Sequence, residues 1–66
     1  MQISYDRLWK LLIDRKMNRT QLRLHTGISS NSLAKLGKNE AVNLEVLLKI
    51  CNFLNVPIEA VVEFVE

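Results

Sequence analysis

The sequence predicts a small all-α domain of five helices, and three observations indicate it. Apolar residues recur at spacings of three and four, which is the period of a helix with one buried face. Asparagine, serine and glycine stand where such helices would begin and end. The connections between the periodic segments are short, and there are no repeats or low-complexity tracts. We therefore expect a single domain over residues 1–66.

The first two helices are predicted from their caps and their apolar spacing. Ser4 is expected to cap the first helix. Its buried stripe consists of Tyr5, Leu8, Trp9, Leu12 and the aliphatic stem of Lys16. Asn18 and Gln21 fit a capping box, in which each side chain binds the other residue's backbone amide, and so mark the start of the second helix. Gly27 ends that helix, since glycine adopts a left-handed cap without steric penalty.

The third and fourth helices are predicted in the same way. Ser29 is expected to cap a third helix that runs through Leu36, and residues 37–39 end it. Asn43 caps the fourth helix, and Asn55 fits its C-terminal cap. The fourth helix repeats apolar residues at the spacing of a buried face, namely Leu44, Leu47, Leu48, Cys51 and Leu54.

The fifth helix is expected from Ile58 to about Val65, because Pro57 suits a first helical turn. One stripe of this helix would seal the core and consists of Ile58, Val61 and Val65. The remaining apolar residues would stay uncovered and form a homodimer interface; these are Ala60, Val62 and Phe64. The alternative is that Phe64 folds back onto Trp9 and completes a monomer.

Metal, cofactor and enzyme sites are not expected. The chain has one cysteine, Cys51, and one histidine, His25, which allow no internal disulfide and cannot complete a zinc site. Cys51 is interpreted as an inert core thiol and His25 as an ordinary helix residue. The sequence also lacks a paired-carboxylate pocket, a phosphate-binding loop and the length for a cleft, which argues against catalysis and against a small-molecule ligand.

Charge divides the chain into a basic front and an acidic back. Residues 1–38 carry eight lysines and arginines against two aspartates, a net charge of +6. Residues 39–66 carry one lysine against five glutamates, a net charge of −4. This division indicates a polyanion partner on one side. Simple solvation of the charged helix faces is the alternative explanation.

The location of the protein is predicted from the same survey. The start, MQISYDRLWK, has charges where the apolar part of a signal peptide would lie. No apolar run reaches the roughly 18 residues that a membrane span needs. Together with the lone cysteine, these features predict a cytoplasmic protein without a membrane partner.

Residues 18–38 carry the functional signal. They form a short helix, a turn at residues 27–29 and a second short helix, which is a helix-turn-helix. The second helix of this motif is the predicted third helix of the chain. Its outer face is polar and consists of Ser30, Asn31, Ser32 and Lys35. Such side chains suit base edges in a major groove, and Arg19, Arg23 and Lys38 place positive charge where phosphates would lie. The alternative is an ordinary amphipathic helix with a polar outer face.

Three ordered motifs in this segment point to a known family. They are Asn18-Arg19-Thr20-Gln21-Leu22, Gly27-Ile28-Ser29 and Leu33-Ala34-Lys35-Leu36. Together they resemble the phage repressor and Cro type of helix-turn-helix, the XRE family. Residues 43–50 and 54–56 resemble that family's fourth helix and its step into the fifth, so the resemblance covers nearly the whole chain. It implies a five-helix lambda-repressor-like fold that binds double-stranded DNA sequence-specifically to regulate transcription.

The resemblance also implies roles for particular residues. The third helix would read base edges through Ser30, Asn31, Ser32 and Lys35. Phosphate contacts would fall to Arg19, Lys38 and Asn39, joined by Arg23 from its flanking position. Two positions depart from the family pattern: Arg23 replaces a small residue, and Gly37 replaces a glutamate, with Asn39 at the family's glycine position. Asparagine tolerates the left-handed conformation that this glycine provides.

A second function remains open, because a fold does not determine a function. The same fold serves as a protein-interaction module, such as an antitoxin or anti-repressor subunit. The basic residues favour DNA, since an interaction module has no need for Arg19, Lys35 and Lys38 together.

Overall fold

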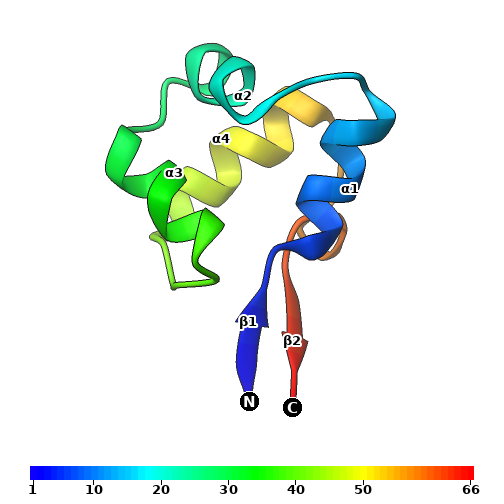
Figure 1. The fold of residues 1–66 in the computed structure, drawn as a ribbon, viewed down its shortest axis with the longest axis vertical. Coiled ribbons are helices and arrows are strands. Elements are labelled where there is room, and N and C mark those ends of the chain that lie inside the picture. Colours follow the sequence, from blue (N-terminus) through cyan, green and yellow to red (C-terminus); the bar gives the residue numbers. More distant parts are fainter.

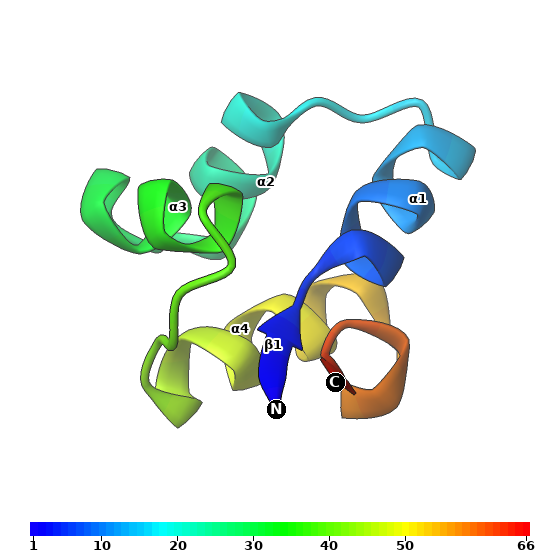
Figure 2. The same cartoon turned by 60° about the horizontal axis from the view of Figure 1, so that its bottom comes forward.

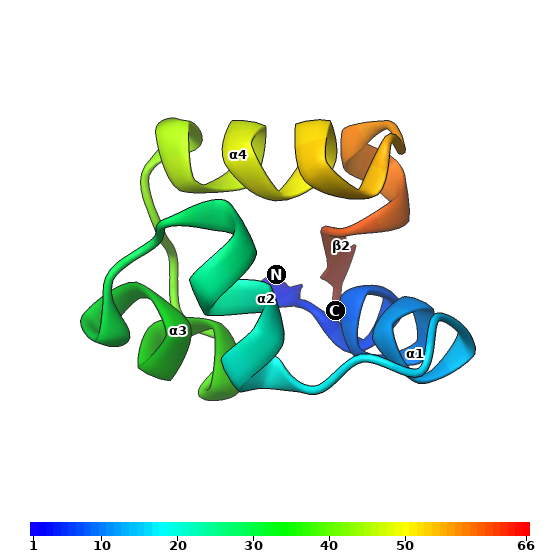
Figure 3. The same cartoon turned by 90° about the horizontal axis from the view of Figure 1, so that it is seen from above.

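The computed structural model describes residues 1–66 as four α-helices with a short two-stranded ribbon at one end (Figure 1). The elements in chain order are β1 (Gln2–Ser4), α1 (Asp6–Asp14), α2 (Arg19–Thr26), α3 (Ser30–Gly37), α4 (Leu44–Leu54), the 3₁₀ turn η1 (Ile58–Ala60) and β2 (Glu63–Val65). The molecule measures 31 × 24 × 17 Å. Seen from above, α4 runs along one side and α1, α2 and α3 lie along the other (Figure 3). No helix is long and apolar enough to cross a membrane.

The predicted fifth helix is wrong. Residues 58–60 form a single 3₁₀ turn, and Glu63–Val65 form β2, which pairs antiparallel with β1 so that Phe64 lies opposite Ile3. Valine and phenylalanine favour strands wherever a partner strand is available. Here the partner comes from the other end of the chain, which helical periodicity within residues 58–65 cannot reveal. The helical class is therefore right, whereas the count of five helices is not.

The predicted N-caps are confirmed at Asn18, Ser29 and Asn43. Asn18 and Gln21 form the complete capping box, with N···O distances of 2.7 and 2.9 Å. The caps of α3 and α4 each accept a bond from the amide three residues on, at 3.1 and 3.0 Å. Ser4 is not the cap of α1, because it ends β1 and the cap position belongs to Tyr5. Its hydroxyl nevertheless accepts a bond from the Asp6 amide at 3.3 Å.

Each of the four helices is followed by a residue in the left-handed conformation, namely Lys16, Gly27, Asn39 and Asn55. Gly27, Asn39 and Asn55 act as the sequence predicted. Lys16 does not, because α1 ends at Asp14 and Lys16 is an exposed residue with φ of 56°. The amides of Lys16 and Met17 donate back to the carbonyls of Ile13 and Leu12, at 3.0 and 2.9 Å. This pair of bonds is the Schellman motif, which needs a left-handed residue where Lys16 stands.

The core lies between α4 and the other helices. Its buried apolar residues are Tyr5, Leu8, Leu12, Leu22, Ile28, Leu36, Val46, Leu47, Ile50, Leu54 and Val61. The predicted buried face of α4 is partly wrong, since Leu44 and Leu48 are 71% and 57% exposed whereas Val46 and Ile50 are buried. Apolar residues surround most of α4, so spacing permits more than one buried face. The packing of α2 against α4 selects the face that is buried.

The left-handed lysine gives a test of helix termination. We expect Lys16→Gly to raise the free energy of unfolding by about 0.5–1 kcal/mol, because glycine removes the steric penalty of a Cβ at positive φ. Urea denaturation measures the change. The control is Lys10→Gly, at an exposed site within α1. This variant is expected to have a free energy of unfolding about 1 kcal/mol lower than that of the wild type. Equal losses in the two variants would contradict the role of Lys16 in ending α1.

Candidate nucleic-acid interface

The turn between α2 and α3 determines the position of α3 at the edge of the molecule. Gly27 has φ of 74°, Ile28 turns into the core at 4% exposure, and Ser29 caps α3. Leu22 of α2 and Leu36 of α3 are fully buried, so each helix contributes its inner face to the core. Figure 2 shows α3 at the edge of the molecule, beside α2 and away from α1. The outer face of α3 is thereby free for a partner.

The polar face predicted on α3 is largely exposed. Ser30, Asn31 and Lys35 are exposed. Ser32 is half-buried, and its hydroxyl oxygen accepts a 3.1 Å bond from the Ser29 hydroxyl. Ala34 is also exposed. Ala34 lies three residues beyond Asn31 and beside Lys35, so it belongs to the same outer face.

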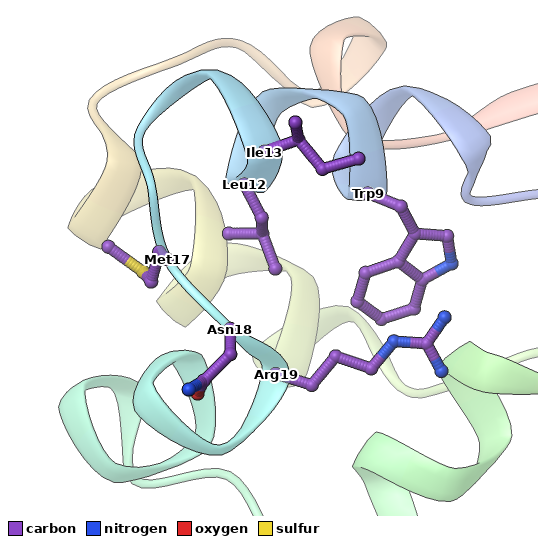
Figure 4. Close-up of a pocket in the computed structure, with 6 residues that line it drawn as sticks. All are labelled: Trp9, Leu12, Ile13, Met17, Asn18 and Arg19. Carbon is purple, nitrogen blue, oxygen red and sulfur yellow. The ribbon is translucent and has the colours of Figure 1, made fainter.

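The four residues predicted to contact phosphate differ in their exposure and in their contacts within the protein. Lys38 is exposed at the C-cap of α3, and Arg23 is half-buried. The exposed Arg19 side chain stacks on Trp9, with its Cζ 4.0 Å from the ring centroid (Figure 4). Asn39 is engaged within the protein, because its Oδ1 accepts the Tyr5 amide at 3.1 Å. The contact between Trp9 and Arg19 was not predicted, because the apolar spacing assigned Trp9 to the core stripe of α1.

The hydrogen bonds of Tyr5 hold the exit of α3. Tyr5 is fully buried, and its hydroxyl donates to the Glu40 carbonyl at 2.7 Å. Together with the bond from its amide to Asn39, this fastens the loop after α3 to the start of α1. Burial raises the pKa of the Tyr5 phenol above its ordinary value of 10.0.

The ion pairs sharpen the division of charge. Arg7 binds the Glu63 carboxylate and the Glu59 carbonyl, each at 2.9 Å, so it belongs to the acidic side of the molecule. The other ion pair joins Lys49 to Glu45 within α4, at 3.6 Å. None of the remaining basic residues of the first 38 positions forms an ion pair: Lys10, Arg15, Lys16, Arg19, Arg23, Lys35 and Lys38. Their charge is therefore free for an anionic partner.

The other residues singled out by the sequence lie outside this surface. His25 is exposed and stacks on Phe53, with ring centroids 5.1 Å apart and planes 8° from parallel. Cys51 is half-buried rather than core, and burial followed by the Glu59 charge raises the pKa of its thiol. No group of three histidine, cysteine or acidic side chains is arranged to hold a metal.

A helix, a tight turn and a second helix with an exposed polar face define a helix-turn-helix domain. The chain belongs to the family of Cro/C1-type helix-turn-helix DNA-binding domains, whose model matches residues 7–66. It is similar to a solved structure, the crystal structure of transcriptional regulator VanUg (Form II), with 52% sequence identity and a TM-score of 0.91. The match covers 94% of this chain and 83% of that one. No curated protein sequence matches the chain significantly.

Tyr5 predicts an alkaline limit to stability. A raised pKa means that the folded state holds the phenolic proton more tightly than the unfolded state, which releases it near pH 10. The contribution of Tyr5 is therefore complete below pH 10 and is lost as the pH rises above it. We expect absorbance titration of this sole tyrosine to give a pKa above 10 in the folded protein. Tyr5→Phe should lower the free energy of unfolding by about 1 kcal/mol at neutral pH and flatten the alkaline decline.

Titration of the folded protein at the ordinary tyrosine pKa would refute this account of Tyr5. The measure is the difference in the free energy of unfolding between wild type and Tyr5→Phe at each pH.

Proposed function

We propose that the chain regulates transcription by binding duplex DNA sequence-specifically, with α3 in the major groove. The observation that carries the proposal is the exposed polar face of α3 between cations that form no ion pair within the protein. A buried or ion-paired surface could not contact base edges and phosphates in this way. The membership in a DNA-binding family and the likeness to a transcriptional regulator support the same conclusion.

The residues of α3 suit different base edges. Asn31 has the amide that pairs with adenine, and Lys35 reaches guanine acceptors. The exposed methyl group of Ala34 suits the thymine methyl, and Ser30 can donate or accept. Ser32 contributes less, because it is half-buried and its hydroxyl is already bonded to Ser29. Specificity is therefore expected to depend chiefly on Asn31 and Lys35.

Phosphate contacts position α3 without reading sequence. Arg19 and Lys38 are exposed on α2 and at the end of α3, and both are suited to this role. Arg23 can reach a phosphate only with the exposed part of its side chain. Asn39 offers its side-chain amide group, since its oxygen is held by Tyr5.

Selection of bound sites from random duplexes tests the function. We expect a defined site, and we expect Asn31→Ala and Lys35→Ala each to reduce discrimination by roughly 1–3 kcal/mol at one or two base pairs. Lys49→Ala is the matched control, because it removes one charge from α4 and should leave the selected site unchanged. Absence of binding on every duplex at low salt would exclude DNA and favour a protein-interaction module. Unchanged sites in both α3 variants would remove α3 as the reader.

We also propose that the working form is a homodimer whose interface includes Ala60, Val62 and Phe64. In the structure these residues lie on η1, in the connection that follows it and on β2 rather than on one continuous α-helix. Phe64 does not cover Trp9, because it lies opposite Ile3 in the ribbon and is 67% exposed. Two adjacent apolar hollows share Leu47 and Ile58, and Val62 and Phe64 line one of them.

A second copy of this chain is the proposed occupant of this surface. The two hollows form one apolar surface with an exposed ribbon edge beside it, and apolar patches of this kind mark contact surfaces. A two-fold pair also presents two α3 helices to half-sites about 34 Å apart, which multiplies the specificity of one short helix.

Sedimentation of Phe64→Lys tests the dimer. Phe64 is 67% exposed, so the variant should remain folded by circular dichroism, become monomeric and lose affinity for palindromic sites. Leu24→Lys is the control, since Leu24 is equally exposed, at 65%, but lies on α2. A wild type that sediments as a monomer at high micromolar concentration would contradict the proposed dimer.

A further inference from the structure

Three helices meet at the guanidinium group of Arg19. Arg19 is the first residue of α2, and its Cζ lies 4.0 Å from the ring centroid of Trp9 in α1 (Figure 4). Its Nη1 also lies beside Gly37, the last residue of α3, because a Cβ placed on Gly37 would be 3.1 Å away. A Cβ at position 37 would require the guanidinium to shift by a few tenths of an ångström.

The stacked guanidinium keeps its hydrogen-bonding capacity. Stacking on an aromatic ring uses the flat face of the group, whereas its five N–H donors lie in its plane. None of these donors forms a hydrogen bond or an ion pair within the protein. A cation held by its face with free in-plane donors is suited to two parallel bonds with the oxygens of a phosphate.

We propose that Trp9 is a positioning residue that holds the Arg19 guanidinium, in the space left by Gly37, ready to bind a DNA backbone phosphate. The inference rests on the proposed DNA-binding function. Arginine loses rotamer freedom when it binds, so a guanidinium that is already held loses less. Arg19 belongs to α2, and its guanidinium lies over Trp9 of α1 and beside the last residue of α3, so the phosphate contact is also tied to the position of the reading helix.

A double-mutant cycle between Trp9 and Arg19 tests the proposal. Trp9→Leu keeps an apolar side chain but removes the π face, and we expect it to weaken binding to all duplexes by about 3–10-fold. Trp9→Phe retains a ring and should restore most of the affinity. In an Arg19→Ala background, Trp9→Leu should have no further effect, and the selected site should be the same in every variant.

Gly37→Ala is a second variant that does not depend on the stability of Trp9 substitutions. Alanine favours the helix, so the protein should remain folded, while the added Cβ should shift the Arg19 guanidinium by a few tenths of an ångström. We expect a smaller loss of affinity in the same direction, which disappears in the Arg19→Ala background. Emission from Trp9, the sole tryptophan, should change in Gly37→Ala and in Arg19→Ala even without DNA.

The outcomes separate this inference from the function on which it rests. Equal losses from Trp9→Leu with and without Arg19, in a wild type that binds DNA, would overturn the positioning role and leave the function intact. Full affinity in Arg19→Ala would also overturn it, because no phosphate contact would remain to be positioned. A wild type that binds no duplex at low salt would overturn both.

Discussion

The bonds that Tyr5 makes to the loop after α3 constrain the rest of the structure. The side chain is fully buried, and its two partners, Asn39 and Glu40, are 34 and 35 residues away in sequence. One bond uses the amide that precedes α1, and the other uses the phenol at the tip of the side chain. The exit of α3, the start of α1 and the adjoining strand β1 are therefore held at one place. Asn39 serves twice there, since its left-handed backbone ends α3 while its side chain binds Tyr5.

This anchoring gives α3 a fixed base from which its outer face projects. The inner side of the helix is held by Leu36 and by the turn at Ile28, both buried. The outer side carries polar groups and a lysine that the fold does not use. In a domain of this size, few residues are free for recognition, because most apolar side chains are needed for the core. The inner face of α3 is therefore held against the core, while its outer face remains available for recognition.

Electrostatics separates the two sides of the molecule further than the sequence alone would. Arg7 is near the chain start, yet its bonds to Glu59 and Glu63 place it with the acidic C-terminal segment and tie α1 to the ribbon. The basic residues that remain are unpaired. Among them Arg19 is exceptional, since an aromatic face rather than a carboxylate holds it. An ion pair would satisfy the same charge but would consume the donors that an anionic partner needs.

The sequence by itself determined the local structure wherever the interacting groups lie within a few residues. The capping box at Asn18 and the caps at Ser29 and Asn43 follow from side chains that bind amides three positions away. The left-handed turn at Gly27 follows from the absence of a Cβ in glycine. The helix-turn-helix and the polar face of α3 follow from these signals, and the family resemblance agrees with the domain family that matches the chain.

Only the tertiary structure decided what depends on residues far apart in the chain. The segment with Phe64 became a strand because β1, from the opposite end, supplied its hydrogen-bonding partner. Packing against α2 left Leu44 and Leu48 exposed on α4, although their spacing suited a buried face. Arg19 lies against Trp9 and beside Gly37 because three helices converge there. Apolar spacing identifies a helix but not its neighbours, since many packings bury similar areas and long-range contacts choose among them.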